Sequence, residues 1–166
     1  MKLKAEGKLM AQASKHEDDL EGLVMGLLGL VLVLIVTGGA YFFISQAITP
    51  GTSLSVNRNS DLVMGWIWVG FGCGFFLYGA VGVIREKIGV GWGNVYWQVR
   101  TTLSGSSAFV AGSGTAVGGL LMLSTSAAYF YSEVSQYFSP FAALLCGFLS
   151  IFFSWAVGAI LHKLGY

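Results

Sequence analysis

The side chains that most often do chemistry are few in this sequence and are not grouped. The two histidines, His16 and His162, lie near opposite ends of the chain, and the two cysteines, Cys73 and Cys146, lie within apolar segments without a CxxC motif. Paired histidines at one depth would indicate haem or a metal ion, and a CxxC pair would indicate dithiol chemistry or zinc. Because neither pattern is present, we expect no metal site and no cofactor, and we interpret both cysteines as small buried hydrophobic residues.

Glycine and serine are the remaining candidates for a reactive or ligand-binding site. The spacing of Gly112, Gly114 and Gly118 superficially matches a dinucleotide-binding loop, which requires a soluble βαβ unit around it. These glycines instead lie in an apolar segment, and no Gly-Lys-Ser/Thr follows them. The serines of the apolar segments have no base at the same depth to activate them. The sequence therefore predicts a protein that is not an enzyme.

The apolar segments that hold these residues are long enough to cross a membrane. Of the 166 residues, 55% are hydrophobic and only 10% are charged, whereas soluble domains average roughly 25% charged residues. A spanning helix needs about 20 apolar residues. Four segments meet this length: about 22–48, 62–84, 106–131 and 140–161. We therefore expect an all-α integral membrane protein, with a bundle of four transmembrane helices over residues 22–166.

The charged residues lie at or outside the ends of these segments, which argues against proton relays and ion-coupled transport. Residues 1–21 form a polar head with four lysines and an acidic cluster, which we interpret as a flexible tail rather than a short surface helix. Ser139 and Pro140 have the residue types of a helix N-cap and first helical position. Every lysine and arginine except Arg58 falls on one side of the four spans. The positive-inside rule then places both termini in the cytoplasm, with the chain in the cell inner membrane.

The segment between the second and third spans is too short and too polar to cross the membrane. Placed at about 100° per residue, the apolar side chains of residues 89–103 fall on one stripe. We expect an amphipathic helix lying in the membrane interface, with a loop that carries aromatic anchors as the alternative. The expected interfacial anchors are Trp92, Tyr96, Arg85, Lys87 and Arg100.

Small residues dominate the first half of the third span, which reads SGSSAFVAGSGTAVGG from Ser104 to Gly119. Small residues let helices approach closely, so we expect this half to face protein, either within the chain or across a subunit boundary. The GxxxG spacing of Gly70 and Gly74 predicts close packing of the second span as well. The expected helix-packing or partner residues are Gly70, Gly74, Gly112, Gly114, Gly118 and Gly119.

These features favour a non-catalytic structural or assembly subunit of a multiprotein inner-membrane complex. Its expected partners are the lipid bilayer and other membrane subunits or further copies of itself, and the net charge of +1 gives no reason to expect nucleic acid. One alternative is a small oligomeric channel or transporter, with the small-residue half of the third span along its path. Another is a pilin-like subunit cleaved after Ala47. Glycine-rich membrane proteins of secretion and conjugation machines have a similar composition, so such a machine is among the candidate host complexes.

Overall fold

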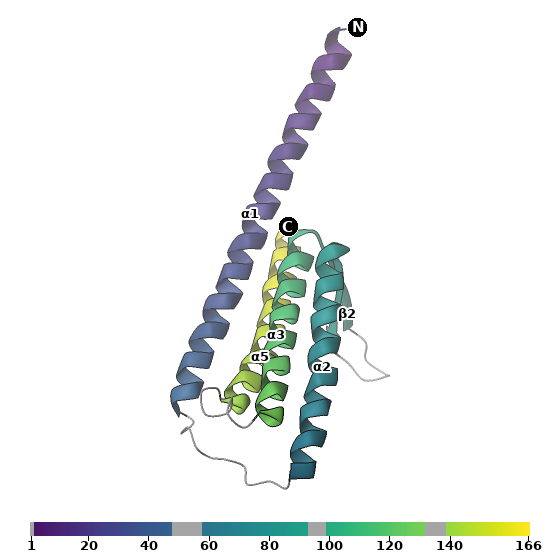
Figure 1. The fold of residues 1–166 in the computed structure, drawn as a ribbon. Helices are drawn as coiled ribbons and strands as arrows, with labels where there is room; N and C mark the ends of the chain where they lie inside the picture. The colour runs from purple at the N-terminus through teal and green to yellow at the C-terminus, as the bar shows by residue number, and fades with distance from the viewer. Residues whose placement is uncertain (1, 48–57, 93–98, 132–138) are drawn as a thin grey trace.

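The computed structural model describes residues 2–47, 58–92, 99–131 and 139–166 of the chain. Its elements, in chain order, are α1 (Lys2–Ala47), α2 (Arg58–Ile84), β1 (Lys87–Trp92), β2 (Val99–Ser104), α3 (Ser106–Phe130) and α5 (Pro140–Leu164). Figure 1 shows the four helices side by side, with the hairpin of β1 and β2 at the end of the bundle where the C-terminus lies.

Each long helix contains one apolar stretch that is long enough to cross a membrane. These stretches are Leu20–Gln46, Leu62–Ile84, Ser106–Phe130 and Pro140–Leu164. They agree with the four spans expected from the sequence to within a few residues at each end. The four-helix part of the expected fold is therefore confirmed, and the apolar helices indicate a multi-pass membrane protein.

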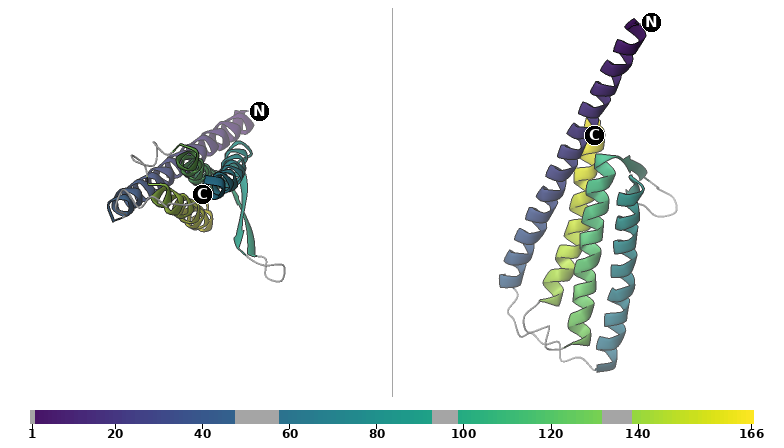
Figure 2. Two further views of the ribbon diagram at one scale, coloured as in Figure 1. Left: turned by 60° about the horizontal axis from the view of Figure 1, so that its bottom comes forward. Right: turned by 45° about the horizontal axis from the view of Figure 1, so that its top comes forward.

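Helix α3 is the centre of the bundle. It packs against α2 on one side and α5 on the other, while α1 lies along α5 and α3 (Figure 2). Of the most apolar window of α3, 56% is buried, against 17% for α2 and 22% for α1. The most buried helix is also the one with the most small residues, because small side chains allow neighbours to approach on several sides.

Helix α1 is continuous from the polar head into the first span. Its 46 residues correspond to a length of about 69 Å at 1.5 Å per residue, more than twice the roughly 30 Å of a hydrocarbon core. The head therefore projects beyond the other helices (Figure 1). The flexible tail that composition favours is wrong for the backbone of residues 2–21, which is helical.

The segment after α2 is an antiparallel hairpin, so the amphipathic helix expected over residues 89–103 is wrong. Its ladder runs from Lys87 opposite Ser104 to Trp92 opposite Val99. Ile88, Val90 and Leu103 are buried and pack with residues of α3, whereas Gly89 and Thr102 face outward. In a strand every second side chain points to the same face, and here that face packs against α3. The burial therefore has a period of two residues and not the helical period that the stripe predicts.

The helix ends explain how these elements are joined. The Ser139 hydroxyl accepts a hydrogen bond from the Ala142 N–H at 3.3 Å, with Pro140 in the first turn, so the expected N-cap of α5 is confirmed. Helix α2 ends at Ile84, and Glu86, in the turn that follows, has a φ of 51°, the left-handed conformation in which glycine is usual. The Gly105 N–H donates to the Glu86 carbonyl at 3.1 Å, which closes the base of the hairpin.

Candidate helix-packing surfaces and an apolar groove

The small residues of α3 face other helices of the same chain. Gly112 and Gly119 face α2, and Gly114 and Gly118 face α5. A Cβ atom added at Gly119 would lie 2.7 Å from the Gly72 carbonyl oxygen, closer than such atoms approach one another. The protein-facing surface expected for Ser104–Gly119 is therefore an internal one.

The contact between α2 and α3 is a reciprocal glycine seam. Gly72 lies opposite Gly119, and Gly79 lies opposite Gly112. In each pair, the carbonyl oxygen of one glycine occupies the space that a Cβ atom on the other glycine would need. Both helices place these glycines seven residues apart. A seven-residue repeat is the spacing at which two helices stay in contact along a shallow left-handed crossing. The backbones of α2 and α3 therefore touch over about two turns.

The contact between α3 and α5 combines glycine with serine hydroxyls. A Cβ at Gly118 would lie 2.6 Å from the Gly147 carbonyl oxygen. The Ser150 hydroxyl donates to the Gly114 carbonyl at 3.0 Å, and the Ser154 hydroxyl donates to the Ile151 carbonyl of its own helix at 2.9 Å. These fully buried serines are used for helix packing, as serines in apolar helices commonly are.

A third glycine surface, on α1, is not among the residues expected from the sequence. Gly22 and Gly26 contact Ser106 at the start of α3, and Gly29 contacts Val110. The signal that could have identified them is their spacing of four and three residues, which places all three on one face of a helix.

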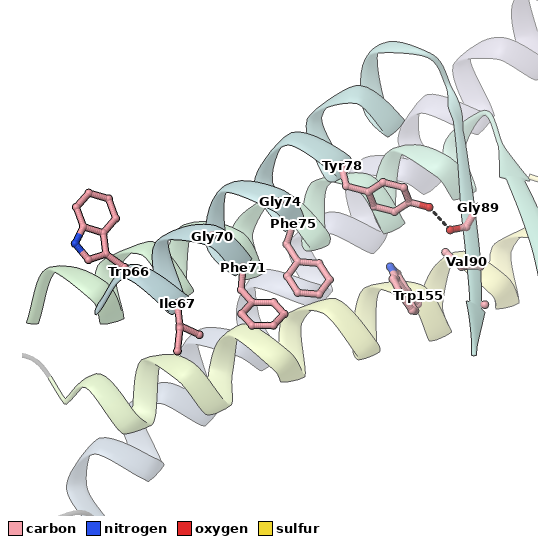
Figure 3. Close-up of a pocket in the computed structure, with 11 residues that line it drawn as sticks. Trp66, Ile67, Gly70, Phe71, Gly74, Phe75, Tyr78, Gly89, Val90 and Trp155 are labelled. Carbon is pink, nitrogen blue, oxygen red and sulfur yellow. Dashed lines mark hydrogen bonds between the residues drawn. The ribbon is translucent and has the colours of Figure 1, made fainter. Parts of the chain in front are cut away.

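Gly70 and Gly74 do not pack against any of the other helices that the structure describes. A Cβ added at either position would meet nothing within 4 Å. Both glycines instead line an open groove of about 890 Å³ between α2, α5 and strand β1. In Figure 3, Phe71 and Phe75 of α2 point toward α5, Trp155 of α5 faces them, and strand β1 closes one end of the groove.

The polar groups at the hairpin end of the groove have hydrogen-bond partners. The Tyr78 hydroxyl donates to the Gly89 carbonyl, which fastens β1 to α2 (Figure 3). The Trp155 indole N–H donates to the Thr115 hydroxyl at 2.9 Å, and this hydroxyl donates to the Ala111 carbonyl at 2.6 Å. The groove is therefore an apolar surface at this end, with its edges held by hydrogen bonds.

The expected interfacial anchors gather at the hairpin. Arg85 and Lys87 are exposed at the junction of α2 with β1. Arg100 is the register partner of Gly91, and Trp92 ends the described part of the ladder. Tyr96 lies outside the described residues.

The C-terminus lies at the same end of the bundle as the hairpin (Figure 1). There the Tyr166 hydroxyl donates to the Glu21 carboxylate at 3.0 Å, so the C-terminal residue is fastened to α1. This hydrogen bond and the negative charge of Glu21 raise the pKa of Tyr166 above its ordinary value of 10.0.

The described residues offer little for metal or thiol chemistry. No group of three or more His, Cys, Asp or Glu side chains that could hold a metal ion occurs among them. Both cysteines are free, and Cys73 is exposed on α2, so the expectation that it is buried is wrong, whereas Cys146 is buried as expected. His162 lies exposed in the last turn of α5.

The described residues thus define a coarse class, a helical protein that has, in this part of the chain, four helices long and apolar enough to span a membrane and one antiparallel pair of strands. Comparison with protein-family models, with curated proteins and with solved structures gave no match to this chain. The function is therefore inferred from the surfaces described above.

Proposed function

We propose that the chain is a non-catalytic structural subunit of a multiprotein complex in the cell inner membrane, with both termini in the cytoplasm. In this proposal the second half of the span in α1 is the surface against which a helix of another subunit packs. The observation that carries it is the exposed glycine pair Gly38 and Gly39.

The glycine pair lies on the face of α1 that points away from the rest of the bundle, next to Thr37, which is buried. No residue from 38 to 46 is buried, and a Cβ at Gly38 or Gly39 would meet nothing within 4 Å. Each glycine costs about 1 kcal/mol relative to alanine inside a helix, and lipid tails give nothing in return. Close approach of a second helix is the gain that glycine permits. Ile35 and Phe42, 66% and 58% exposed, lie on the same face and would flank that helix.

The internal packing supports this proposal over the two alternatives. A channel would need the small-residue half of α3 along its path, but that half lies between α2 and α5. Cleavage after Ala47 would remove α1, whose Gly22, Gly26 and Gly29 are fitted against α3. The cytoplasmic orientation is supported by the basic residues near the hairpin, which share one end of the bundle with the C-terminus.

The test is co-purification of the tagged protein from its native membranes in a mild detergent, followed by quantitative mass spectrometry. We expect other membrane proteins to co-purify with the wild-type protein in fixed proportion. In Gly39→Leu the amount of these proteins that co-purifies should fall by about tenfold or more. Gly74→Leu is the matched control, since it adds the same side chain at an equally open glycine on the other side of the bundle. A wild-type protein that purifies alone, or a Gly39→Leu variant that keeps every partner, would contradict the proposal.

A further inference from the structure

The groove on α2 is a furrow whose floor lacks side chains. Gly70 and Gly74 leave the helix surface bare, and a Cβ at Gly89 would meet only the Tyr78 hydroxyl, at 3.5 Å. The residues of α2 that line the groove run from Trp66 to Tyr78, a rise of about 18 Å along the helix axis. One leaflet of a bilayer is about 15 Å thick in its hydrocarbon part, so the furrow has the length of one lipid tail.

The hairpin makes this furrow a better fit for a flexible chain than for a helix. Ile88 and Val90 are buried against the bundle, and Tyr78 fastens Gly89, so β1 is held across the end of the groove. A helix is about 10 Å wide with its side chains, and one that spanned the membrane along α2 would meet β1. A hydrocarbon chain can bend past the bare backbone of Gly89.

Basic residues lie at the end of the groove that the hairpin closes. Arg85 and Lys87 are exposed there, and neither forms an ion pair with the part of the chain that the structure describes. Lys87 is two residues from Gly89 and therefore lies on the same, outward face of β1. Glu86, between Arg85 and Lys87 in the sequence, is the acidic residue beside these two bases. The local charge is positive where a lipid headgroup would lie.

From the bare furrow, the blocking hairpin and the basic end, we propose that this groove binds one anionic phospholipid. An acyl chain lies along Gly74 and Gly70 between the aromatic side chains, and the phosphate headgroup lies against Arg85 and Lys87. The inference requires insertion of the four spans in a membrane, but it does not depend on the subunit proposal, which concerns the opposite side of the bundle.

Native mass spectrometry of the detergent-purified protein tests this proposal, with phosphatidylglycerol and phosphatidylcholine of identical acyl chains as the probes. A basic residue near a headgroup contributes about 1 kcal/mol, or about fivefold in affinity, so Arg85 and Lys87 together predict about thirtyfold tighter binding of phosphatidylglycerol. The double variant Arg85→Gln/Lys87→Gln should bind the two lipids about equally, while phosphatidylcholine binds to it as to the wild type.

Gly74→Leu fills the furrow and should weaken the binding of both lipids at least tenfold. Gly39→Leu, equally open but on α1, should leave both affinities unchanged, and circular dichroism checks that each variant keeps its helices. Wild-type affinities that are equal for the two lipids would overturn the proposal, as would a Gly74→Leu variant that binds them normally. The photoreactive variant Phe71→benzoylphenylalanine should label lipid in native membranes. Labelling of a second copy or of another protein's helix would also overturn it.

Discussion

Alanine substitutions at two glycines, Gly119 and Gly74, should change stability in opposite directions. A Cβ at Gly119 would lie 2.7 Å from the Gly72 carbonyl oxygen and 2.9 Å from the Phe76 Cα, which are backbone atoms that move only with the whole of α2. Such overpacking costs about 3 kcal/mol at the upper end of its range, and the higher helix propensity of alanine returns about 1 kcal/mol. Gly119→Ala should therefore lower the free energy of unfolding by about 2 kcal/mol.

At Gly74 the added methyl group meets nothing within 4 Å, so only helix propensity changes. Gly74→Ala should raise the free energy of unfolding by up to about 1 kcal/mol. The assay is reversible unfolding of both variants and the wild type in mixed detergent micelles, followed by circular dichroism. Equal stabilisation by the two substitutions would refute the internal glycine seam, because it would place Gly119 on an open surface like that of Gly74.

Three further predictions concern hydrogen bonds and backbone conformation. Thr115→Val leaves the Trp155 indole N–H without its acceptor and should lower the free energy of unfolding by about 1 kcal/mol, while Thr115→Ser should change it little. Glu86→Gly should raise the same free energy by about 1 kcal/mol and Glu86→Val should lower it, because φ at this residue is 51°. The Tyr166 hydroxyl donates to Glu21 only while it is protonated, so this contact stabilises fully below pH 10.0 and is lost as pH rises through the raised pKa. Difference ultraviolet titration of the tyrosines should show one midpoint move down in Glu21→Gln, and an unchanged titration would contradict the contact.

Helix positions could be predicted from the sequence because each depends on local residues. The spans follow from uninterrupted apolar length, and the start of α5 follows from the capping chemistry of Ser139 and Pro140. The hairpin cannot be predicted from the sequence, because a helical stripe and a strand alternation both fit residues 89–103. The choice between them is made by tertiary packing, since Ile88 and Leu103 are buried against Ala108 and Ala111 of α3.

The faces of α2 could not be predicted because the helix is apolar on every side. The GxxxG spacing indicates Gly70 and Gly74 as packing residues, yet the seam with α3 uses Gly72 and Gly79 at a spacing of seven. Hydrophobic periodicity normally identifies the buried face, and a helix without a polar face gives no such signal. For α3 the sequence does predict contact with protein. Small residues occur around most of this helix, so some of them face protein whichever side of the helix is buried.

The most direct test of the central claim is the intact mass of the protein released gently from its native membranes, measured by native mass spectrometry. We expect a complex in which this chain is bound to other membrane proteins and retains an anionic phospholipid. Gly39→Leu should release the proteins and leave the lipid, and Gly74→Leu should release the lipid and leave the proteins. A single chain that carries neither proteins nor lipid would contradict both proposals.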